Sequence, residues 1–233
     1  MVKQFKKICN VFFVSAMILT AQSSFAQQTA TPSKEDIAKA DAEIEKKAGE
    51  WTASLKLTDE AKTKRVQDAV ATHLKAVRDW HNNNPFTMVP AGINPSTGGS
   101  LSELDRQVII CSAKPKSVHA DLMTVLKAEL DSTQIETIMD KYTVGKVAFT
   151  LQGYKAIVPD LTEKEETEIL KNLKQAREQA IDYKSIKEIS AIFEIYKTKC
   201  EQYLNNNGRN WRQLFKDYVN KVKAQKEAEK NKQ

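Results

Sequence analysis

The chain has 233 residues, and its formal net charge of +6 includes three lysines that lie within the first 26 residues. Without that segment, 33 basic residues face 30 acidic ones, and the remaining charge of +3 gives little support for nucleic-acid binding. The sequence contains no glycine-rich phosphate loop, no Gly-x-Ser-x-Gly elbow and no His-Glu-x-x-His pair, so the usual signatures of nucleotide-binding proteins, serine hydrolases and zinc proteases are absent.

Residues 1–26 have the three parts of a secretory signal peptide. A basic start is followed by an apolar run from Ile8 to Thr20 and by the small-residue pattern Ser24-Phe25-Ala26. We expect cleavage after Ala26 and a periplasmic or secreted protein. Cys9 lies too early to be the lipid-modified cysteine of a lipoprotein. No later stretch reaches the roughly 20 apolar residues of a membrane span, so none is predicted.

Residues 27–50 are predicted to form a short polar leader and an amphipathic helix. Ser33 and Asp36 have the spacing of a capping box, which satisfies the free backbone N–H groups at a helix start. From Ile37 onward, apolar residues recur every three or four positions, as in a helix with one buried face. We expect the main helical domain at residues 51–222 and a fraying charged tail at residues 223–233.

The second predicted helix begins at Thr58 and keeps its apolar face as far as Trp80 and His81. In this register, Trp80 and His81 point inward, whereas Arg78 and Asp79 point outward. The helical pattern then stops.

The stretch Asn82–Gly99 is the least regular part of the chain and holds three prolines and three glycines. A loop of this length in a compact helical domain is more often functional than a plain connection. His81 comes directly before it and Phe86 lies within it, so we expect a groove lined by this loop near His81, Phe86, Arg78 and Arg177.

Further capping signals near residues 100, 117, 131, 162 and 185 each introduce an apolar repeat of helical period. Residues 143–158 are ambiguous, because their β-branched and aromatic residues also suit a hairpin. Val147, Leu151 and Tyr154 stand at helical spacing, and we favour a helix. The sequence thus predicts an all-α, single-domain bundle of about seven to nine helices with one long irregular loop.

Two cysteines follow the signal segment, Cys111 and Cys200. Each falls on the apolar face of its helix, so a disulfide and two buried thiols are both compatible with the pattern. Two cysteines and three scattered histidines provide no metal-ligand spacing. We therefore predict no metal and no cofactor.

His81 and Arg177 are polar residues at positions where apolar ones are expected. His81 is either a histidine packed at a helix end or an acid, base or ligand-binding imidazole at a pocket mouth. Arg177 either forms a buried ion pair, with Asp79, Asp105 or Asp140, or holds a ligand carboxylate in bidentate fashion. His73 is interpreted as a core residue, and His119 as exposed and without a role.

Aromatic residues form the last group of candidates. Trp80, Tyr154, Tyr196, Tyr203 and Trp211 could provide a platform on which sugars stack, but aromatic residues at helical spacing usually belong to the core. Phe86 is the exception, because it lies in the loop. The candidate binding residues are therefore His81, Arg177, Arg78, Phe86 and Tyr154, and no catalytic residue is assigned.

Five segments carry a resemblance to a known family: "DRQ" at 105–107, "DKYTVGK" at 140–146, "IVPDLTEKE" at 157–165, "AREQAID" at 176–182 and "IFEIYKTKCEQYL" at 192–204. The chain resembles a secreted, all-helical family of unknown function, mainly of Bacteroidetes type, whose members often occur near polysaccharide-degradation genes. The resemblance extends from about residue 51 to residue 219. It implies a setting of glycan use and no mechanism.

We expect an exported accessory or binding protein whose partner is an oligosaccharide or another exported protein, since no catalytic signature is present. The alternative is an enzyme that acts on acidic glycans, with His81 as acid or base, or Tyr154 as base, and Arg177 as carboxylate clamp. An interaction protein that docks through its first or last helix is a third hypothesis.

Overall fold

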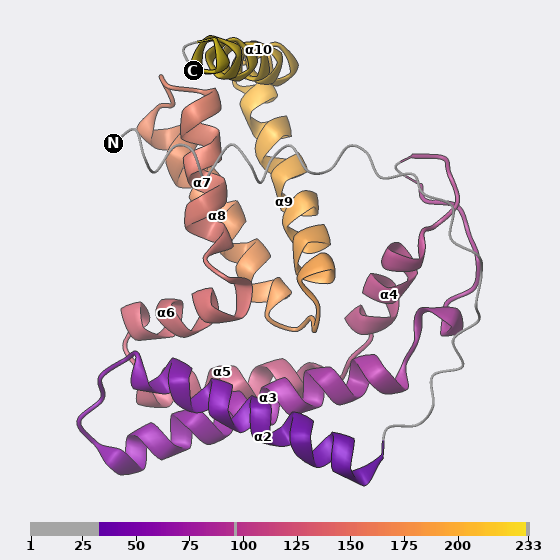
Figure 1. Ribbon diagram of the computed structural model, residues 1–233, viewed down its shortest axis with the longest axis vertical. Helices are drawn as coiled ribbons and strands as arrows, with labels where there is room; N and C mark the ends of the chain where they lie inside the picture. The colour runs from indigo at the N-terminus through magenta and orange to yellow at the C-terminus, as the bar shows by residue number, and fades with distance from the viewer. Residues whose placement is uncertain (1–32, 96, 232–233) are drawn as a thin grey trace.

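The computed structural model describes residues 33–95 and 97–231, where the regular structure is helical (Figure 1). The helices are α2 (Lys34–Ala53), α3 (Glu60–Asn83), the 3-10 helix η1 (Phe86–Met88), α4 (Glu103–Ser112), α5 (Lys116–Glu129), α6 (Ser132–Thr143), α7 (Lys146–Ile157), α8 (Glu163–Ala180), α9 (Ile186–Asn206) and α10 (Trp211–Lys230). The predicted all-α bundle is confirmed. None of the helices in the described ranges is long and apolar enough to cross a membrane. The predicted signal peptide lies outside the described residues.

Side-chain caps determine where many of the helices begin. In a capping box, two side chains three positions apart each accept a bond from the other residue's backbone N–H. The described chain has capping boxes that start at Ser33, Ser102, Asp131, Thr162 and Ser185. At α4 the box joins Ser102 to Asp105, so the start predicted near residue 100 was two residues early.

Two apolar cores fill the bundle. Buried residues of α2, α3, α5 and α6 form one core, which we call the amino-terminal core. Buried residues of α4, α7, α8 and α9 form the other, the carboxyl-terminal core. In Figure 1, α2, α3 and α5 lie across the lower part of the molecule, and α7, α8 and α9 rise above them. Burial of this apolar surface is the main stabilising contribution to the fold.

The connection between α8 and α9 links the two cores. Ile181 packs in the amino-terminal core and Tyr183 packs in the carboxyl-terminal core. Asp182 stands between them, so a carboxylate lies at the boundary of two apolar regions.

Residues 143–158, the ambiguous stretch, form the end of α6 and the helix α7. Val144 and Gly145 link the two helices, and both have left-handed backbones with φ of 54° and 67°. The left-handed residue at the end of α6 reverses the chain without a longer loop. The structure therefore confirms helix rather than hairpin for this stretch.

The long loop packs along α4. Arg106 donates from Nε and Nη2 to the backbone oxygen of Val89, at 2.8 and 2.5 Å. Gln107 donates to the backbone oxygen of Asn84 at 3.1 Å. An isolated antiparallel bridge between Ile93 and Ser100 closes the far end of the loop. The loop is thus ordered by side chains of α4 that satisfy its carbonyl groups.

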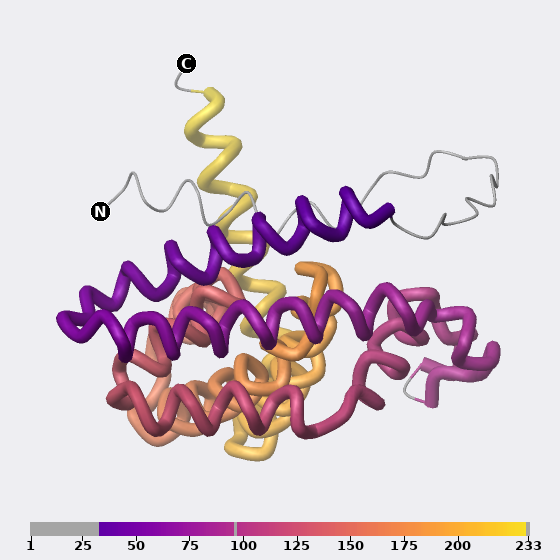
Figure 2. The backbone as a smooth tube through the Cα atoms, turned by 90° about the horizontal axis from the view of Figure 1, so that it is seen from below, coloured from indigo at the N-terminus to yellow at the C-terminus, as the bar shows by residue number. Residues whose placement is uncertain are grey.

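The last helix differs from the prediction, because α10 continues through the charged segment to Lys230. Lysine and glutamate have a high helix propensity, so the helix continues through this segment although the segment has no apolar face. Figure 2 shows the carboxyl end of α10 projecting away from the other helices.

The two cysteines are free and buried. The Cys111 thiol lies 3.7 Å from Oε1 of Glu188, and the Cys200 thiol lies 3.9 Å from the backbone oxygen of Ile169. Of the two possibilities that the sequence left open, buried thiols are therefore the one observed.

Candidate functional site

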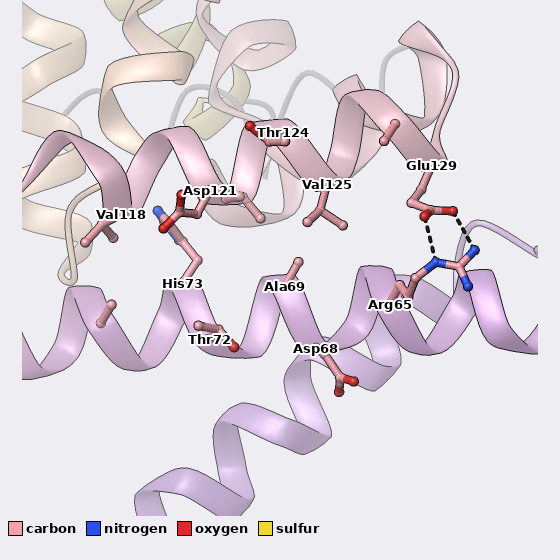
Figure 3. Close-up of a pocket in the computed structure, with 13 residues that line it drawn as sticks. Arg65, Asp68, Ala69, Thr72, His73, Val118, Asp121, Thr124, Val125 and Glu129 are labelled. Carbon is pink, nitrogen blue, oxygen red and sulfur yellow. Dashed lines mark hydrogen bonds and ion pairs between the residues drawn. The ribbon is translucent and has the colours of Figure 1, made fainter.

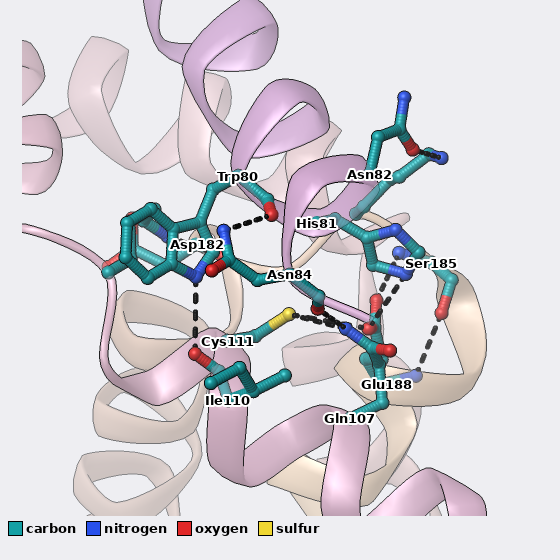
Figure 4. Close-up of polar contacts among 12 residues, drawn as sticks. Trp80, His81, Asn82, Asn84, Gln107, Ile110, Cys111, Asp182, Ser185 and Glu188 are labelled. Carbon is teal, nitrogen blue, oxygen red and sulfur yellow. Dashed lines mark hydrogen bonds and ion pairs between the residues drawn. The ribbon is translucent and has the colours of Figure 1, made fainter. Parts of the chain in front are cut away.

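His81 lies in the last turn of α3 and faces the start of α9. Its Nε2 atom is 3.2 Å from Oε1 of Glu188, and its side chain is 25% exposed. Figure 4 shows His81, Ser185 and Glu188 grouped at this helix start. Burial alone would raise the pKa of Glu188, but bonds from His81 and Ser185 bring it below its ordinary value. His81 therefore contacts a buried carboxylate that also caps α9.

Arg78 does not point outward, and that expectation was wrong. Its side chain is 14% exposed, and Nη1 donates to Asp41 of α2 at 2.5 Å while Nε donates to Asp79 at 2.8 Å. The amphipathic helix α2 packs along α3 and supplies a carboxylate that the sequence register of α3 alone could not reveal. Arg78 thus joins α2 to α3.

Phe86 lies in the 3-10 helix of the loop. The guanidinium of Arg106 stands over its ring, 5.2 Å from the centroid, in a cation–π contact. Phe86 therefore helps to fix the loop on α4.

Arg177 is buried on α8, with 4% of its side chain exposed. Nη1 donates to Asp140 of α6 at 2.7 Å, and Nη2 lies 3.6 Å from Oε1 of Glu136. Of the three partners named from the sequence, Asp140 is the one that the structure provides. The guanidinium thus meets two carboxylates of the protein itself.

These four residues have separate neighbours. Arg78 contacts α2, His81 contacts α9, Phe86 contacts α4, and Arg177 contacts α6. Within the described residues, no partner is shared between His81 and Arg177. The roles of His81 as acid or base and of Arg177 as clamp remain predictions from the sequence that no contact supports.

Tyr154, the fifth candidate, lies in a groove of about 810 Å³ between α7, α9 and α10, which we call the aromatic groove. Its ring centroid is 5.1 Å from that of Trp211. Trp211 stacks on Phe215 with centroids 6.1 Å apart and an angle of 27° between the rings. Tyr154 is buried, whereas Phe215 is 39% exposed. The groove therefore combines a buried aromatic floor with a partly exposed aromatic wall.

Charged side chains complete the aromatic groove. Lys146, Lys197, Glu194 and Glu201 line it together with the aromatic rings. Burial lowers the pKa of Lys146 and raises that of Glu201. The Tyr154 hydroxyl donates to the backbone oxygen of Lys197 at 3.1 Å, and burial raises its pKa far above the ordinary value. The phenol is therefore a neutral hydrogen-bonding group and not a base.

The three histidines of the chain all pair with carboxylates in or beside the α8–α9 connection. His81 pairs with Glu188, and both His73 and His119 pair with Asp182. We call His73, His119, Lys114 and Asp182 the Asp182 cluster. It lies at the boundary between the two cores.

The Asp182 cluster joins three segments through one carboxylate. Nε2 of His73 is 2.9 Å from Oδ1, and Nδ1 of His119 is 3.2 Å from Oδ2. Lys114 donates to the backbone oxygen of Asp182 at 2.6 Å, and its Nζ is 3.7 Å from Oδ1. His73 and Lys114 are buried, whereas 27% of the His119 side chain is exposed.

The environment shifts the pKa values of these groups in different directions. Burial would raise the pKa of Asp182, but bonds from His119 and His73 and the charge of Lys114 hold it well below its ordinary value. Burial lowers the pKa of His73 and of Lys114. The bond to Asp182 raises the pKa of His119. His73 is thus the neutral histidine of the pair, and His119 is the one that gains a proton more readily.

Two grooves flank α5. One lies between α3 and α5 (Figure 3) and has small and apolar walls that include Ala69, Val118 and Val125. A double hydrogen bond from Arg65 to Glu129 closes one end of it. The other groove, of about 510 Å³, opens beside His119, Lys114 and Asp182. In the described ranges no group of three or more His, Cys, Asp or Glu side chains is arranged to hold a metal ion.

Sequence reasoning missed the Asp182 cluster. His119 was interpreted as exposed, but it is only 27% exposed and pairs with Asp182. His73 was correctly placed in the core but without its partner. Asp182 follows α8 within "AREQAID", a motif quoted above, yet its partners lie 63 and 109 positions earlier in the chain. Only the packing of α3 and α5 against the end of α8 reveals the cluster.

The model of one protein family matches the chain over residues 41–224, and its description reads "Protein of unknown function (DUF3826)". A comparison with curated proteins found no match.

Proposed function

The chain belongs to the DUF3826 family of proteins of unknown function, and from its site geometry we propose that it is an exported, non-catalytic protein that binds an oligosaccharide in the aromatic groove. The observation that carries the proposal is the stack of Trp211 on Phe215 above Tyr154. Sugar rings present C–H faces that pack on aromatic rings. The polar handle of a tyrosine and nearby charged groups can bond sugar hydroxyls.

The size and the lining of the groove support this function. Its volume of about 810 Å³ falls within the range of about 300–1,000 Å³ that is usual for small-molecule sites. Lys146 and Glu194 line the groove and offer a donor and an acceptor. A groove with aromatic walls and both kinds of polar partner suits a neutral or weakly charged ligand that is rich in hydroxyl groups.

The amino-terminal pattern supports export, and the sequence resemblance adds a setting of glycan use. In that setting a protein without a catalytic signature would hold or deliver a saccharide, either alone or with another exported protein. Determination of the amino-terminal residue of the protein recovered from cells tests the export step, with Gln27 expected after cleavage.

Calorimetric titration of the exported protein with a panel of neutral and acidic oligosaccharides tests binding. We expect Phe215→Ala to weaken binding of the preferred saccharide about three- to tenfold, because it removes one stacking ring. Phe86→Ala removes an aromatic ring from the distant loop and is the matched control. If no saccharide binds, or if Phe215→Ala and Phe86→Ala have the same effect, the proposal is wrong.

A further inference from the structure

We propose that the groove beside His119 is a second ligand site, which binds a small molecule through its carboxylate group. The groove is lined by Lys114, Lys116, His119, Glu178, Asp182 and Tyr183, among others. This site is separate from the aromatic groove and does not depend on the function proposed there.

The groups around Asp182 have more hydrogen-bond donors than their contacts with Asp182 use. Its two carboxylate oxygens face the imidazoles of His73 and His119, and the ammonium of Lys114. An ammonium has three N–H donors, and a protonated imidazole has two. Lys114 uses one donor on the backbone oxygen of Asp182, and His119 faces the carboxylate with Nδ1, so a further Lys114 donor and the Nε2 donor of a protonated His119 remain for a ligand.

A carboxylate of the protein already approaches the outer nitrogen of His119. Nε2 lies 3.8 Å from Oε1 of Glu178, whose side chain is 55% exposed. More than half of this side chain is exposed to solvent, so packing contacts stabilise its position only weakly. The carboxylate of Glu178 therefore marks where a ligand carboxylate would lie, and it can move into water when a ligand arrives.

The charges around His119 also favour an anion. His119 is faced by Asp182 from the α8–α9 connection, Glu178 from α8, Lys114 from the turn before α5, and His73 from α3. When His119 is protonated and Glu178 is displaced, Lys114 and His119 outweigh Asp182 by one positive charge. Lys114 is 8% exposed, so an anion at this point interacts with a cation that water screens poorly.

Two further titratable residues that line the groove, Cys111 and Tyr183, are uncharged, which agrees with binding through the charged groups. Cys111 borders the groove, but burial raises the pKa of its thiol, so it is not a ready nucleophile. Burial raises the pKa of Tyr183 to about 12, which keeps the phenol neutral. The cationic groups that can distinguish ligands here are therefore His119, Lys114 and the exposed Lys116.

The test is an NMR titration of the exported protein in which the ring nitrogens of the histidines are observed. D-Glucuronate, lactate and neutral D-glucose serve as probes at about pH 5.5 and about pH 8, on either side of the ordinary histidine pKa. We expect glucuronate or lactate, but not glucose, to shift the His119 signals and to bind about tenfold more weakly at the higher pH. Binding of both acids assigns the site to the carboxylate alone, and binding of glucuronate alone assigns it to an acidic sugar.

Three variants sharpen this test. Glu178→Gln removes the internal competitor from an exposed position and is expected to tighten acid binding about threefold. His119→Gln is expected to weaken it about tenfold. His81→Gln alters the other partly exposed histidine that pairs with a carboxylate, and it should have no effect. The proposal is wrong if neither acid shifts the His119 signals of the unaltered protein or of Glu178→Gln, or if Glu178→Gln weakens binding.

Discussion

Nε2 of His73 lies 2.9 Å from Oδ1 of Asp182, although 109 positions separate the two residues. The contact crosses the boundary between the cores, because Ile181 and Tyr183 on either side of Asp182 pack in different ones. A partly buried carboxylate with one partner would be destabilising, and the second histidine and Lys114 offset that cost. The boundary is therefore held by charges that depend on pH.

The first prediction concerns the pH dependence of stability. The folded pKa of His119 lies above the ordinary value of about 6.5, so its contribution is fully present below about pH 6.5 and is lost as the pH rises through the folded value. The folded pKa of His73 lies below the ordinary value, so a destabilising contribution appears as the pH falls below about 6.5. The two histidines thus have opposite effects.

Variants separate these two effects. The free energy of unfolding, measured with urea between about pH 5 and about pH 8, should rise more steeply with pH in His119→Gln than in the unaltered protein. In His73→Gln it should rise less steeply. Only the slopes are compared, because either variant also changes the absolute stability. Equal slopes of unfolding free energy against pH in all three proteins would contradict the opposite effects of His73 and His119.

The second prediction concerns the buried pair of Arg177 and Asp140. Arg177→Met removes the buried charge, keeps an apolar chain of similar length, and leaves Asp140 at a position where its side chain is 40% exposed. We expect a loss of less than about 1 kcal/mol in unfolding free energy. Asp140→Asn combined with Glu136→Gln leaves the guanidinium buried without an anion and should cost about 2–3 kcal/mol. Urea denaturation measures the loss of unfolding free energy in both variants. A larger loss in Arg177→Met than in the double variant would contradict the buried ion pair.

The third prediction concerns Val144, a β-branched residue in the left-handed region and 75% exposed. Such a backbone costs an L-residue roughly 1–2 kcal/mol, whereas glycine adopts it freely. Val144→Gly should therefore raise the unfolding free energy by about 0.5–1 kcal/mol after the entropy of glycine is included. Val144→Ala keeps the Cβ atom and serves as the control, with a smaller change expected. Thermal or urea unfolding provides the measurement.

The fourth prediction concerns thiol reactivity. Burial raises the pKa of the Cys200 thiol to about 12 and raises that of Cys111 as well. Thiolates are the reactive form, so both cysteines of the folded protein should resist iodoacetamide at neutral pH and react fully in urea. Mass spectrometry counts the labelled sites. Rapid labelling of Cys111 in the folded protein would show that the groove beside it admits the reagent.

The sequence predicted those parts of the fold that depend on neighbours along the chain. Capping boxes and apolar repeats located the helices, and the three carboxylates considered as partners of Arg177 included Asp140, the one observed. Contacts between helices that are distant in the sequence could not be predicted in this way. Arg78 was placed outward because the position of Asp41 on α2 was not known, and His119 lacked a role because Asp182 reaches it only through tertiary packing.

The candidate site was harder to predict for the same reason. Tyr154 was chosen from helical spacing, but its neighbours Trp211 and Phe215 come from a helix more than 50 positions later. An apolar pattern predicts that such a ring is buried, but it does not predict which helix packs against it. A groove between three helices depends on how they pack against one another, and no local pattern records that.

The division into two cores also has a consequence for any shortened form of the chain. Residues 44–142 contain the buried members of the amino-terminal core except Ile181, which comes from the end of α8. A fragment that ends at α6 would therefore lack one side chain of its own core, and His73 and His119 would lack their contact with Asp182. Two adjacent residues, Ile181 and Asp182, thus complete the amino-terminal half of the molecule and join it to the carboxyl-terminal half.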